Sequence, residues 1–268
     1  MTVALLGVGA DSTNASPTPP LYPDGRFEYI PIPESQGPEG TVETRTYDSS
    51  PLRYRDAPMA DYLDAIVPDP NEGTQFTGAQ LADWPLHHDP NFEALTYGET
   101  TSRGSYTKIL RTLEPGDLVA FYTGLRSDAA YRHRYIIGYF TVAELIDFQR
   151  VERDGRELSF SDFPAPEQDA LMHEHCENAH AKRFEATGEI AANDGLVIVE
   201  GTEPGGLLDE AFRISQHGGG GHHYLTDELQ ETFSPEPGGN PDRNAHLGGI
   251  KTAHVLDIAP AAFRQLVG

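Results

Sequence analysis

Residues 116–122 read Gly-Asp-Leu-Val-Ala-Phe-Tyr, and residues 135–142 read Tyr-Ile-Ile-Gly-Tyr-Phe-Thr-Val. Both stretches are short apolar runs rich in β-branched and aromatic residues, which is typical of buried strands. A Pro-Gly-Asp turn at 115–117 opens the first run. We therefore predict two paired strands at Leu118–Tyr122 and Tyr135–Val142.

Outward from this pair, the pattern predicts both strands and helices. The expected strands are Val3–Leu6, Phe27–Ile32, Leu196–Glu200 and Ala253–Ile258, with a hairpin over Val151–Leu158 centred on Asp-Gly. The expected helices are Met59–Ile66, Ser105–Leu113, Glu167–Phe184, a segment near Leu207–Ile214, and a C-terminal helix that starts at Pro260. Long loops are expected at 33–58 and 234–249. Because there is no strict β-α-β rhythm, we predict one α+β domain over 1–268, with a mixed or partly closed sheet, flanking helices and long surface loops.

The charge of the chain is strongly negative. Its 268 residues include 42 Asp plus Glu against 19 Lys plus Arg, which gives a net charge of -23, and only three residues are lysine. Near molar salt the Debye length falls to about 3 Å, so repulsion between carboxylates is screened. This composition predicts a halophilic, archaeal protein, and it disfavours generic binding to a phosphate backbone, which depends on a basic surface.

The expected location is the cytoplasm. No stretch approaches the roughly 18 apolar residues of a membrane span, so no membrane partner is expected. The N-terminus has no basic region and no cleavage site of a signal peptide. Cys176 is the single cysteine, which excludes an internal disulfide and fits a reducing compartment.

The stretch Leu86–Pro90 is the first candidate site, since it joins His87 and His88 to Asp89. The carboxylate could orient a histidine that acts as general base, or share a metal ion with it. The alternative is an Asp-Pro turn with exposed histidines.

A second candidate site is the stretch from His173 to His180, which also contains His175 and Cys176. On one helix, His173, Cys176 and His180 would lie along a single face, and three such ligands leave a zinc position open. The alternative is a polar helix face with one buried thiol. No known zinc motif matches, so neither a metal site nor any other cofactor is assigned from the sequence.

Three further segments carry residues suited to ligand binding. Asp11 and Ser12 follow the first strand in a tight turn, where a dinucleotide fingerprint is excluded by the absent third glycine. Arg132 and Arg134 form the one basic cluster, suited to a phosphate or carboxylate unless they make only local ion pairs. The loop 217–223 has four glycines bounded by imidazoles; His217 and His222 could flank a ligand there, or the loop could be a mobile surface segment.

Several segments, taken in order, resemble the type 3 family of nucleotide-modification-associated domains. The matching pieces are Gly9–Ser12 with Ser16-Pro17, Pro23-Asp24-Gly25, Ile30–Pro33, His87–Phe92, Gly116–Tyr122, Ile136–Val142, His173–His175 and Asn193-Asp194. The resemblance implies a role near DNA-modifying enzymes, a nucleotide or modified base as ligand, and proteins of modification or defence systems as partners. Family members tend to have a pair of basic residues just before the aspartate that corresponds to Asp11. This chain has Val8, Gly9 and Ala10 there instead. If the basic pair binds a phosphate in the family, Arg132 and Arg134 would take over that role here.

The stretch 116–142 is also similar to PUA-like domains of the EVE and ASCH type, within a β subregion of about 105–160. Such domains bind a nucleobase in a pocket with an aromatic lip. Tyr122, Thr123 and Tyr139 would form that lip here.

The sequence therefore predicts nucleotide or nucleobase handling associated with nucleic-acid modification. The candidate catalytic residues, for acid–base or metal-assisted chemistry on a base, are Asp11, His87, His88, Asp89, His173 and His175. The candidate substrate-binding residues are Ser12, Asp24, Tyr122, Thr123, Arg132, Arg134, Tyr139, His217 and His222. The alternative is a reader that binds a modified base without changing it, and a purely structural subunit is a third option. Whether the protein is an enzyme stays open at this level.

Overall fold

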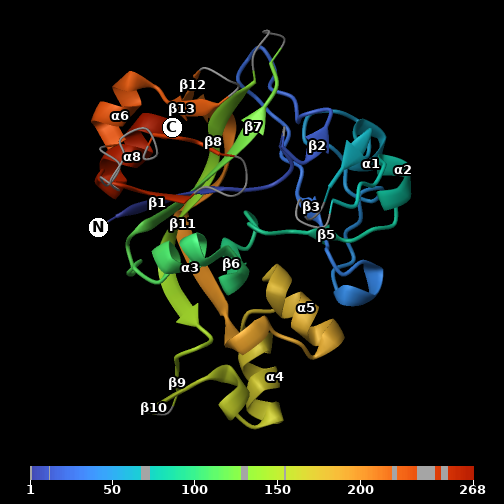
Figure 1. Ribbon diagram of the computed structural model, residues 1–268, viewed down its shortest axis with the longest axis vertical. Coiled ribbons are helices and arrows are strands. Elements are labelled where there is room, and N and C mark those ends of the chain that lie inside the picture. The colour runs from blue at the N-terminus through green and yellow to red at the C-terminus, as the bar shows by residue number, and fades with distance from the viewer. Residues whose placement is uncertain are drawn as a thin grey trace.

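The computed structural model describes residues 2–11, 13–67, 73–127, 132–153, 155–218, 222–233, 245–248 and 253–268. Its centre is a curled, mixed six-stranded sheet (Figure 1). In spatial order the strands are β14 (Ala253–Leu256), β1 (Val3–Gly7), β7 (Leu118–Leu125), β8 (His133–Asp147), β11 (Leu196–Arg213) and β6 (Thr96–Thr100). The β1–β7 pair is parallel and the other neighbours are antiparallel. The predicted α+β class with a mixed sheet is confirmed.

The smaller elements lie around this sheet. The helices are α1 (Met59–Tyr62), α2 (Gly78–Leu81), α3 (Gly104–Leu110), α4 (Ala165–Glu174), α5 (Ala179–Thr187), α6 (Asp227–Phe233) and α8 (Pro260–Val267). Two-stranded pairs are formed by β2 (Ala15–Ser16) with β4 (Ala65–Ile66), β3 (Ile32–Pro33) with β5 (Leu86–His87), β9 (Val151–Arg153) with β10 (Arg156–Leu158), and β12 (Ser215–His217) with β13 (His223–Leu225). Short 3-10 helices cover Pro38–Gly40, Thr101–Arg103, Phe160–Asp162 and Ala192–Asp194.

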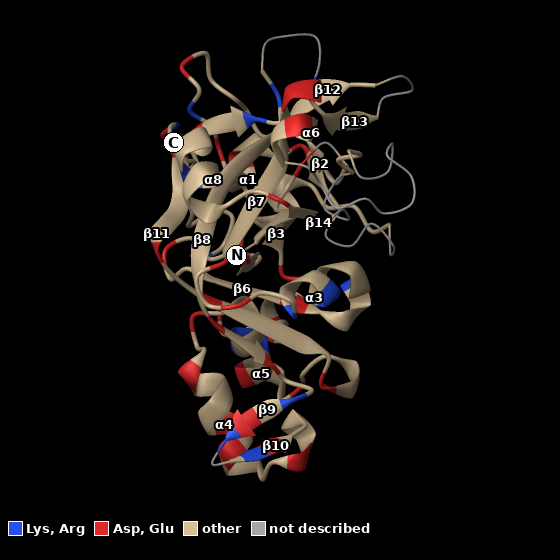
Figure 2. Cartoon of the chain, turned by 90° about the vertical axis from the view of Figure 1, so that its left-hand side faces the viewer, with Lys and Arg blue, Asp and Glu red and all other residues tan. Residues whose placement is uncertain are grey.

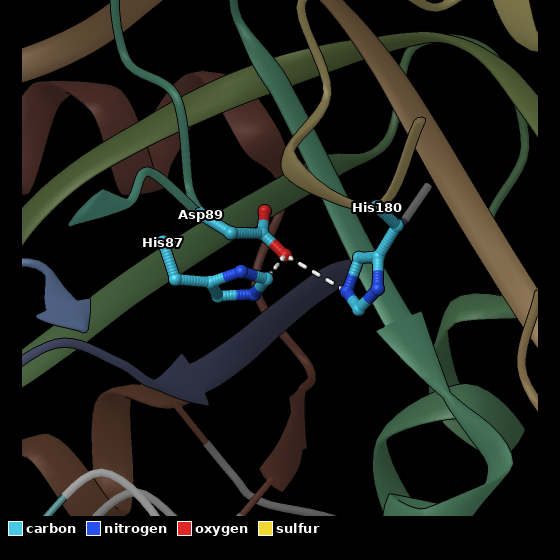
Figure 3. Close-up of side chains that lie close together, drawn as sticks. All are labelled: His87, Asp89 and His180. Atoms are coloured by element: carbon cyan, nitrogen blue, oxygen red, sulfur yellow. Dashed lines mark ion pairs between the residues drawn. The ribbon is translucent and has the colours of Figure 1, made fainter. Parts of the chain in front are cut away.

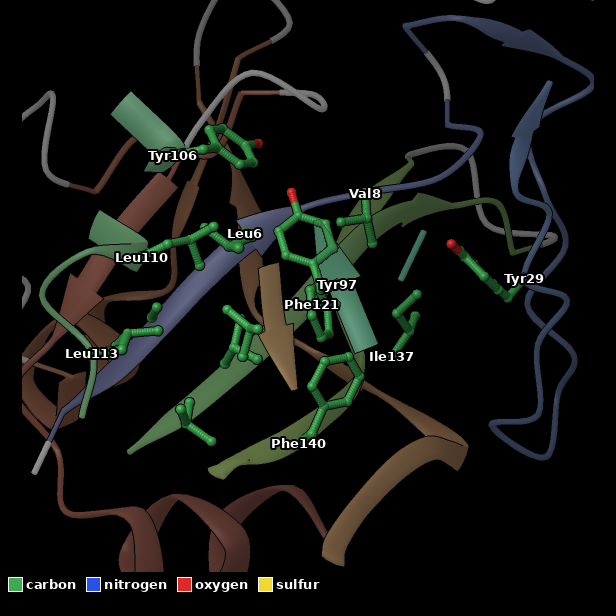
Figure 4. Packing of buried hydrophobic residues seen from close by; sticks show 14 of the residues in the cluster. Leu6, Val8, Tyr29, Tyr97, Tyr106, Leu110, Leu113, Phe121, Ile137 and Phe140 are labelled. Carbon is green, nitrogen blue, oxygen red and sulfur yellow. The ribbon is translucent and has the colours of Figure 1, made fainter. Parts of the chain in front are cut away.

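Strand β7 is buried along its whole length because both faces of the sheet are covered. Side chains of a strand alternate between the faces, so Val119 and Phe121 join one core and Ala120 and Tyr122 the other. Helix α3 and the β6 strand close the first core, which Figure 4 shows from close by. Helices α6 and α8 close the second. Both central strands are confirmed, and each is longer than predicted.

Two further apolar clusters extend the molecule from the sheet. One lies where β8 and β11 reach beyond the sheet centre, and α4 and α5 cover it at the lower end of Figure 1. The other is built by the N-terminal third around Tyr47, which is fully buried and donates its hydroxyl to the Pro31 carbonyl at 2.6 Å. The long loop predicted at 33–58 thus has little regular structure, yet its middle packs into a core.

The structure corrects four of the predicted elements. Residues 207–213 continue strand β11 instead of forming a helix, because Phe212 and Arg213 pair with Ile136 and Tyr135 of β8. Ladder hydrogen bonds to a neighbouring strand outweigh local helix propensity. The region 27–30 is not a strand, although its residues are buried and Ala10 donates to the Ile30 carbonyl.

The third and fourth corrections concern helices. The helix predicted from Met59 to Ile66 ends at Tyr62, because Ala65–Ile66 pairs with β2. The helix predicted over Glu167–Phe184 is two helices, since Asn178 starts α5 and its side chain accepts from the His180 N–H. Asparagine is a favoured residue at such a helix start, and its short polar side chain competes with continuation of the preceding helix.

Acidic residues are distributed over the molecule rather than gathered on one face. Figure 2 shows them from α6 at one end to α4 and β10 at the other. None of the helices in the described ranges is long and apolar enough to cross a membrane.

Candidate functional site

The site begins where β5 leads into a tight loop. His87 is the last residue of β5, which pairs with β3, so that Ile32 lies opposite His87. Asp89 follows two residues later, and both of its carboxylate oxygens accept from the Gly98 N–H of β6, at 2.9 and 3.2 Å. These backbone contacts fix His87 and Asp89 on the same side of the loop.

The third member of the site comes from another part of the chain. His180 is the second residue of α5, and its position follows from the Asn178 cap, whose amide also donates to the Thr96 hydroxyl of β6. The ring passes directly over Gly98: a Cβ atom at that position would lie 2.5 Å from His180 Cδ2. Glycine at 98 therefore permits α5 to bring His180 to Asp89.

The three side chains point toward one another (Figure 3). The Asp89 Oδ2 atom lies 3.8 Å from His87 Nε2 and 3.4 Å from His180 Nε2. The imidazole rings stand edge to face, with centroids 5.1 Å apart. All three side chains are at most 10% exposed. We call His87, Asp89 and His180 the triad.

Burial governs the electrostatics of the triad. It raises the pKa of Asp89 to about 7, although the charge of His87 and the Gly98 N–H act in the opposite direction. It lowers the pKa of His180 to about 4, and the charge of Arg183 lowers it further. At neutral pH His180 is thus uncharged, while Asp89 is divided between its protonated and ionised forms.

Glu34 and Arg183 stand behind His87. His87 Nδ1 lies 3.1 Å from Glu34 Oε2, and Arg183 donates to Glu34 Oε1 at 2.7 and 3.0 Å. Burial raises the pKa of Glu34, but the hydrogen bond with His87 and the charges of His87 and Arg183 outweigh it and lower the pKa to about 2. Since this carboxylate can only accept, it favours the His87 tautomer with the proton on Nδ1.

A second ion pair, between Arg103 and Glu99, also acts on the triad. Arg103 contacts Glu99 at 3.2 Å, and the Tyr97 hydroxyl donates to the same carboxylate at 3.0 Å. The charge of Arg103, like that of Arg183, acts to lower the pKa of Asp89. The Tyr29 hydroxyl is buried and has no hydrogen-bond partner among the described residues, and the charge of Asp89 adds to the burial that raises its pKa.

The other histidines predicted for this chemistry lie apart from the triad. The pKa of His88 falls to about 4 through burial and the charge of Arg45, and its buried Nδ1 atom has no partner in the described part of the chain. His173 is exposed. His175 is buried, with Nδ1 2.8 Å from Glu200 Oε1 and its ring beside Phe148.

Asp11 forms a separate buried centre with Arg134. Asp11 Oδ2 lies 2.6 Å from Arg134 Nη1, and both side chains are at most 4% exposed. Asp11 also accepts from the backbone and hydroxyl of Thr13. Ser12 lies outside the described residues, and Asp24 forms an exposed ion pair with Arg26.

The residues predicted for an aromatic lip are part of the core. Tyr122 is fully buried, and its hydroxyl donates to the Gly248 carbonyl at 3.1 Å. Thr123 is buried and donates to the Ala10 carbonyl. The Tyr139 ring stands edge-on to Phe263 of α8.

The remaining predicted residues lie near the β12–β13 pair or at the surface. Arg132, His217 and His222 are exposed. The His217 ring contacts that of His223, and the His222 ring contacts that of His246. These histidines form their own group, remote in sequence from the triad.

Most of the residues that complete the site cannot be recognised in the sequence. The sequence predicts His180 only as a partner of Cys176, and no motif points to Glu34, Glu99, Arg103 or Arg183. Only His180 has a local signal in the sequence, because it follows Asn178, a residue type that favours the start of a helix. A hollow of about 430 Å³ has no triad residue in its lining, which consists of Glu43, Thr44, Arg45, Asn91, Glu93, Ala94, Glu177 and Lys182.

A comparison with family models covers the segments that carry the triad. The family model described as nucleotide modification associated domain 3 matches residues 2–244. The chain belongs to this family. The matched range includes all three triad residues and both ion pairs beside them. No curated protein and no solved structure matches the chain.

Proposed function

We propose that this member of the nucleotide modification associated domain 3 family is an enzyme that modifies a nucleotide or nucleobase, with the triad as its reaction centre. The family supports an association with nucleotide modification. The observation that carries the enzymatic assignment is the convergence of a carboxyl and two imidazoles, from β5, its loop and α5, at one buried place.

The chemistry of the triad fits polar catalysis. Clusters of buried side chains with strongly shifted pKa values are typical of catalytic sites. Near neutral pH, a carboxyl with a pKa of about 7 readily donates and accepts a proton, and a bound cation can take the place of that proton. Both proton transfer by side chains and metal-assisted chemistry on a base fit this constellation.

The surroundings of the triad suit an anionic substrate. Arg103 and Arg183 flank Asp89, and their side chains are 31% and 18% exposed. Each guanidinium keeps donors beyond those used by its glutamate, because arginine has five N–H groups. We propose that these free donors bind a substrate phosphate, which compensates locally for the negative charge of the whole chain.

The reader hypothesis has less support from the structure. A lip that stacks on a base needs an accessible aromatic face, whereas Tyr122 is fully buried and Tyr139 packs on α8. The experiment below nevertheless separates the two functions, because a reader binds its ligand without changing it.

We also propose a setting for this function. The net charge of -23 suits the salt-rich cytoplasm of a halophilic archaeon, where repulsion is screened. Proteins of modification or defence systems would supply or use the product, with residues 1–268 acting as one domain.

The test is turnover. Purified protein is incubated with deoxynucleoside mono- and triphosphates and with DNA, in molar KCl with divalent metal ions, and nucleoside masses are followed by mass spectrometry. We expect a mass change with the wild type and a loss of about 100-fold or more in Asp89→Asn and His180→Asn. The matched control, Asp169→Asn on the exposed face of α4, should keep full activity. Unchanged masses together with tight binding of a modified base would favour the reader, and full activity in Asp89→Asn would refute the assignment.

A further inference from the structure

We infer that His87, Asp89 and His180 form a binding site for a divalent transition-metal ion. The inference concerns the same site as the proposed function and rests on it only for the substrate. Metal binding itself is independent of which nucleotide, if any, the protein changes.

The spacing of the three side chains is the first argument. The Asp89 oxygen lies 3.4 and 3.8 Å from the two Nε2 atoms, which is too long for good hydrogen bonds. One ligand atom from each residue lies within 4.8 Å of the others. An ion with bonds of about 2.0–2.2 Å holds its ligand atoms roughly 3 to 3.5 Å apart. Small inward movements of the side chains would therefore complete the coordination.

The orientation of the ligands is the second argument. The Glu34 carboxylate accepts from His87 Nδ1, which leaves the lone pair of Nε2 directed at Asp89. Histidines that bind metals usually donate their other ring N–H to a carboxylate or carbonyl in this way. Arg183 holds Glu34 in place with two hydrogen bonds.

The charges around the triad are the third argument. Arg183 is paired with Glu34, and Arg103 with Glu99. Within the described ranges, Asp89 makes ion-pair contacts only with His87 and His180, and with no lysine or arginine. A buried carboxylate normally has a cationic partner or coordinates a metal. A divalent cation at the centre of the triad would supply the missing positive charge.

The ligand types decide the class of metal. Imidazole nitrogen with a single carboxylate suits zinc, iron, cobalt or manganese, whereas magnesium and calcium prefer oxygen ligands alone. Three protein ligands leave coordination positions for water or a substrate oxygen. Two histidines with one carboxylate are thus the donor set of a reactive centre rather than of a closed structural site.

The rival ligand set fails on geometry. His173, Cys176 and His180 would need one continuous helix, but α4 ends at Glu174 and α5 starts at Ala179. His173 and Cys176 are also exposed, whereas His180 is directed into the interior at Asp89. This set provides the matched controls for the experiment.

The experiment measures binding of Co²⁺, Zn²⁺, Mn²⁺ and, without oxygen, Fe²⁺ to protein stripped with a chelator. Calorimetry gives stoichiometry and affinity, and the visible absorption of bound Co²⁺ reports its ligands. We expect one ion per chain, with loss of binding and of the cobalt band in His87→Ala, Asp89→Ala and His180→Ala. Glu34→Gln keeps all three ligands, so it should weaken binding by about 10- to 100-fold without abolishing it.

The controls are His173→Ala and Cys176→Ser, which should bind like the wild type. Circular dichroism of every variant shows whether the fold is kept, and Glu34→Gln remains informative if an alanine variant does not fold. Loss of binding in the two controls, unchanged binding in the folded triad variants, or no binding of any of the four ions would each overturn the inference. Metal binding without nucleotide turnover would instead contradict the proposed function alone, and turnover by a protein that binds none of the four ions would contradict the metal inference alone.

Discussion

Asp11 and Arg134 are 123 residues apart in the sequence, and their charged atoms lie 2.6 Å apart in the interior. Close to them, Gly124 leaves room for the guanidinium, since a Cβ there would lie 2.1 Å from Arg134 Nη1. The Arg134 Nε atom is buried without a hydrogen-bond partner. Breaking a buried ion pair from one side leaves an uncompensated charge, which costs more than the pair contributes.

At the residue scale we therefore predict that Asp11→Asn lowers the free energy of unfolding by about 3–5 kcal/mol. Urea unfolding followed by circular dichroism measures this change. Asp24→Asn is the matched control, because Asp24 also pairs with an arginine but is exposed, and it should have no measurable effect. Equal midpoints for Asp11→Asn and the wild type would show that the buried pair does not stabilise the fold.

At the scale of elements, the site depends on how closely α5 approaches β6. Asn178 connects them, because its amide donates to Thr96 while its oxygen accepts from the His180 N–H. Gly98 allows the contact: a Cβ there would lie 2.5 Å from His180 Cδ2 and 2.9 Å from Asn178 Oδ1. A methyl group at this position must push α5 away from Asp89.

We predict that Gly98→Ala weakens metal binding by about 10- to 100-fold, as loss of an orienting contact does at other metal sites. The central sheet should remain intact, because β6 is an edge strand. The control is Gly104→Ala in α3, where no atom lies within 4 Å of the added methyl group. Calorimetric titration with Co²⁺ measures the affinity of both variants. Wild-type affinity in Gly98→Ala would contradict the prediction and would mean that α5 can shift without loss of the site.

At the scale of the whole molecule, two charge effects lower the stability of the fold under different conditions. Carboxylates give the chain its net charge of -23, so their mutual repulsion weakens the folded state unless salt screens it. Buried histidines act in another pH range. Burial lowers the pKa values of His223 and His254 from 6.5 to about 4, and one ring nitrogen of each is buried without a partner.

We predict that the protein loses stability as the pH falls from about 6.5 to 4. In this range the unfolded chain binds more protons at His223 and His254 than the folded chain does, so acid favours unfolding. Each imidazole contributes at most on the order of 3 kcal/mol. Urea midpoints measured between pH 7 and pH 4.5 should fall less steeply in His254→Phe than in the wild type.

The exposed His173→Gln variant should behave like the wild type and is the control for that series. Repeating the titration in molar KCl separates the two effects, since salt should raise stability at pH 7 but leave the acid slope in place. A slope that is the same in His254→Phe would contradict the assignment to this histidine.

The sequence alone was sufficient for the central strands and for two residues of the site. Leu118–Tyr122 and Tyr135–Val142 are predictable because a buried strand shows its environment in its own local composition. His87 and Asp89 are predictable as a candidate pair because only one residue separates them in the chain.

The other strand residues and the other side chains of the site depend on tertiary contacts. Residues 207–213 became a strand only because β8 offers a ladder of hydrogen bonds, which outweighs the local pattern. His180 joins Asp89 because Asn178 starts a new helix over Gly98, while Glu34 and Arg183 meet across 149 residues of chain. Contacts of this kind arise from packing between distant segments, and no short stretch of sequence contains both partners.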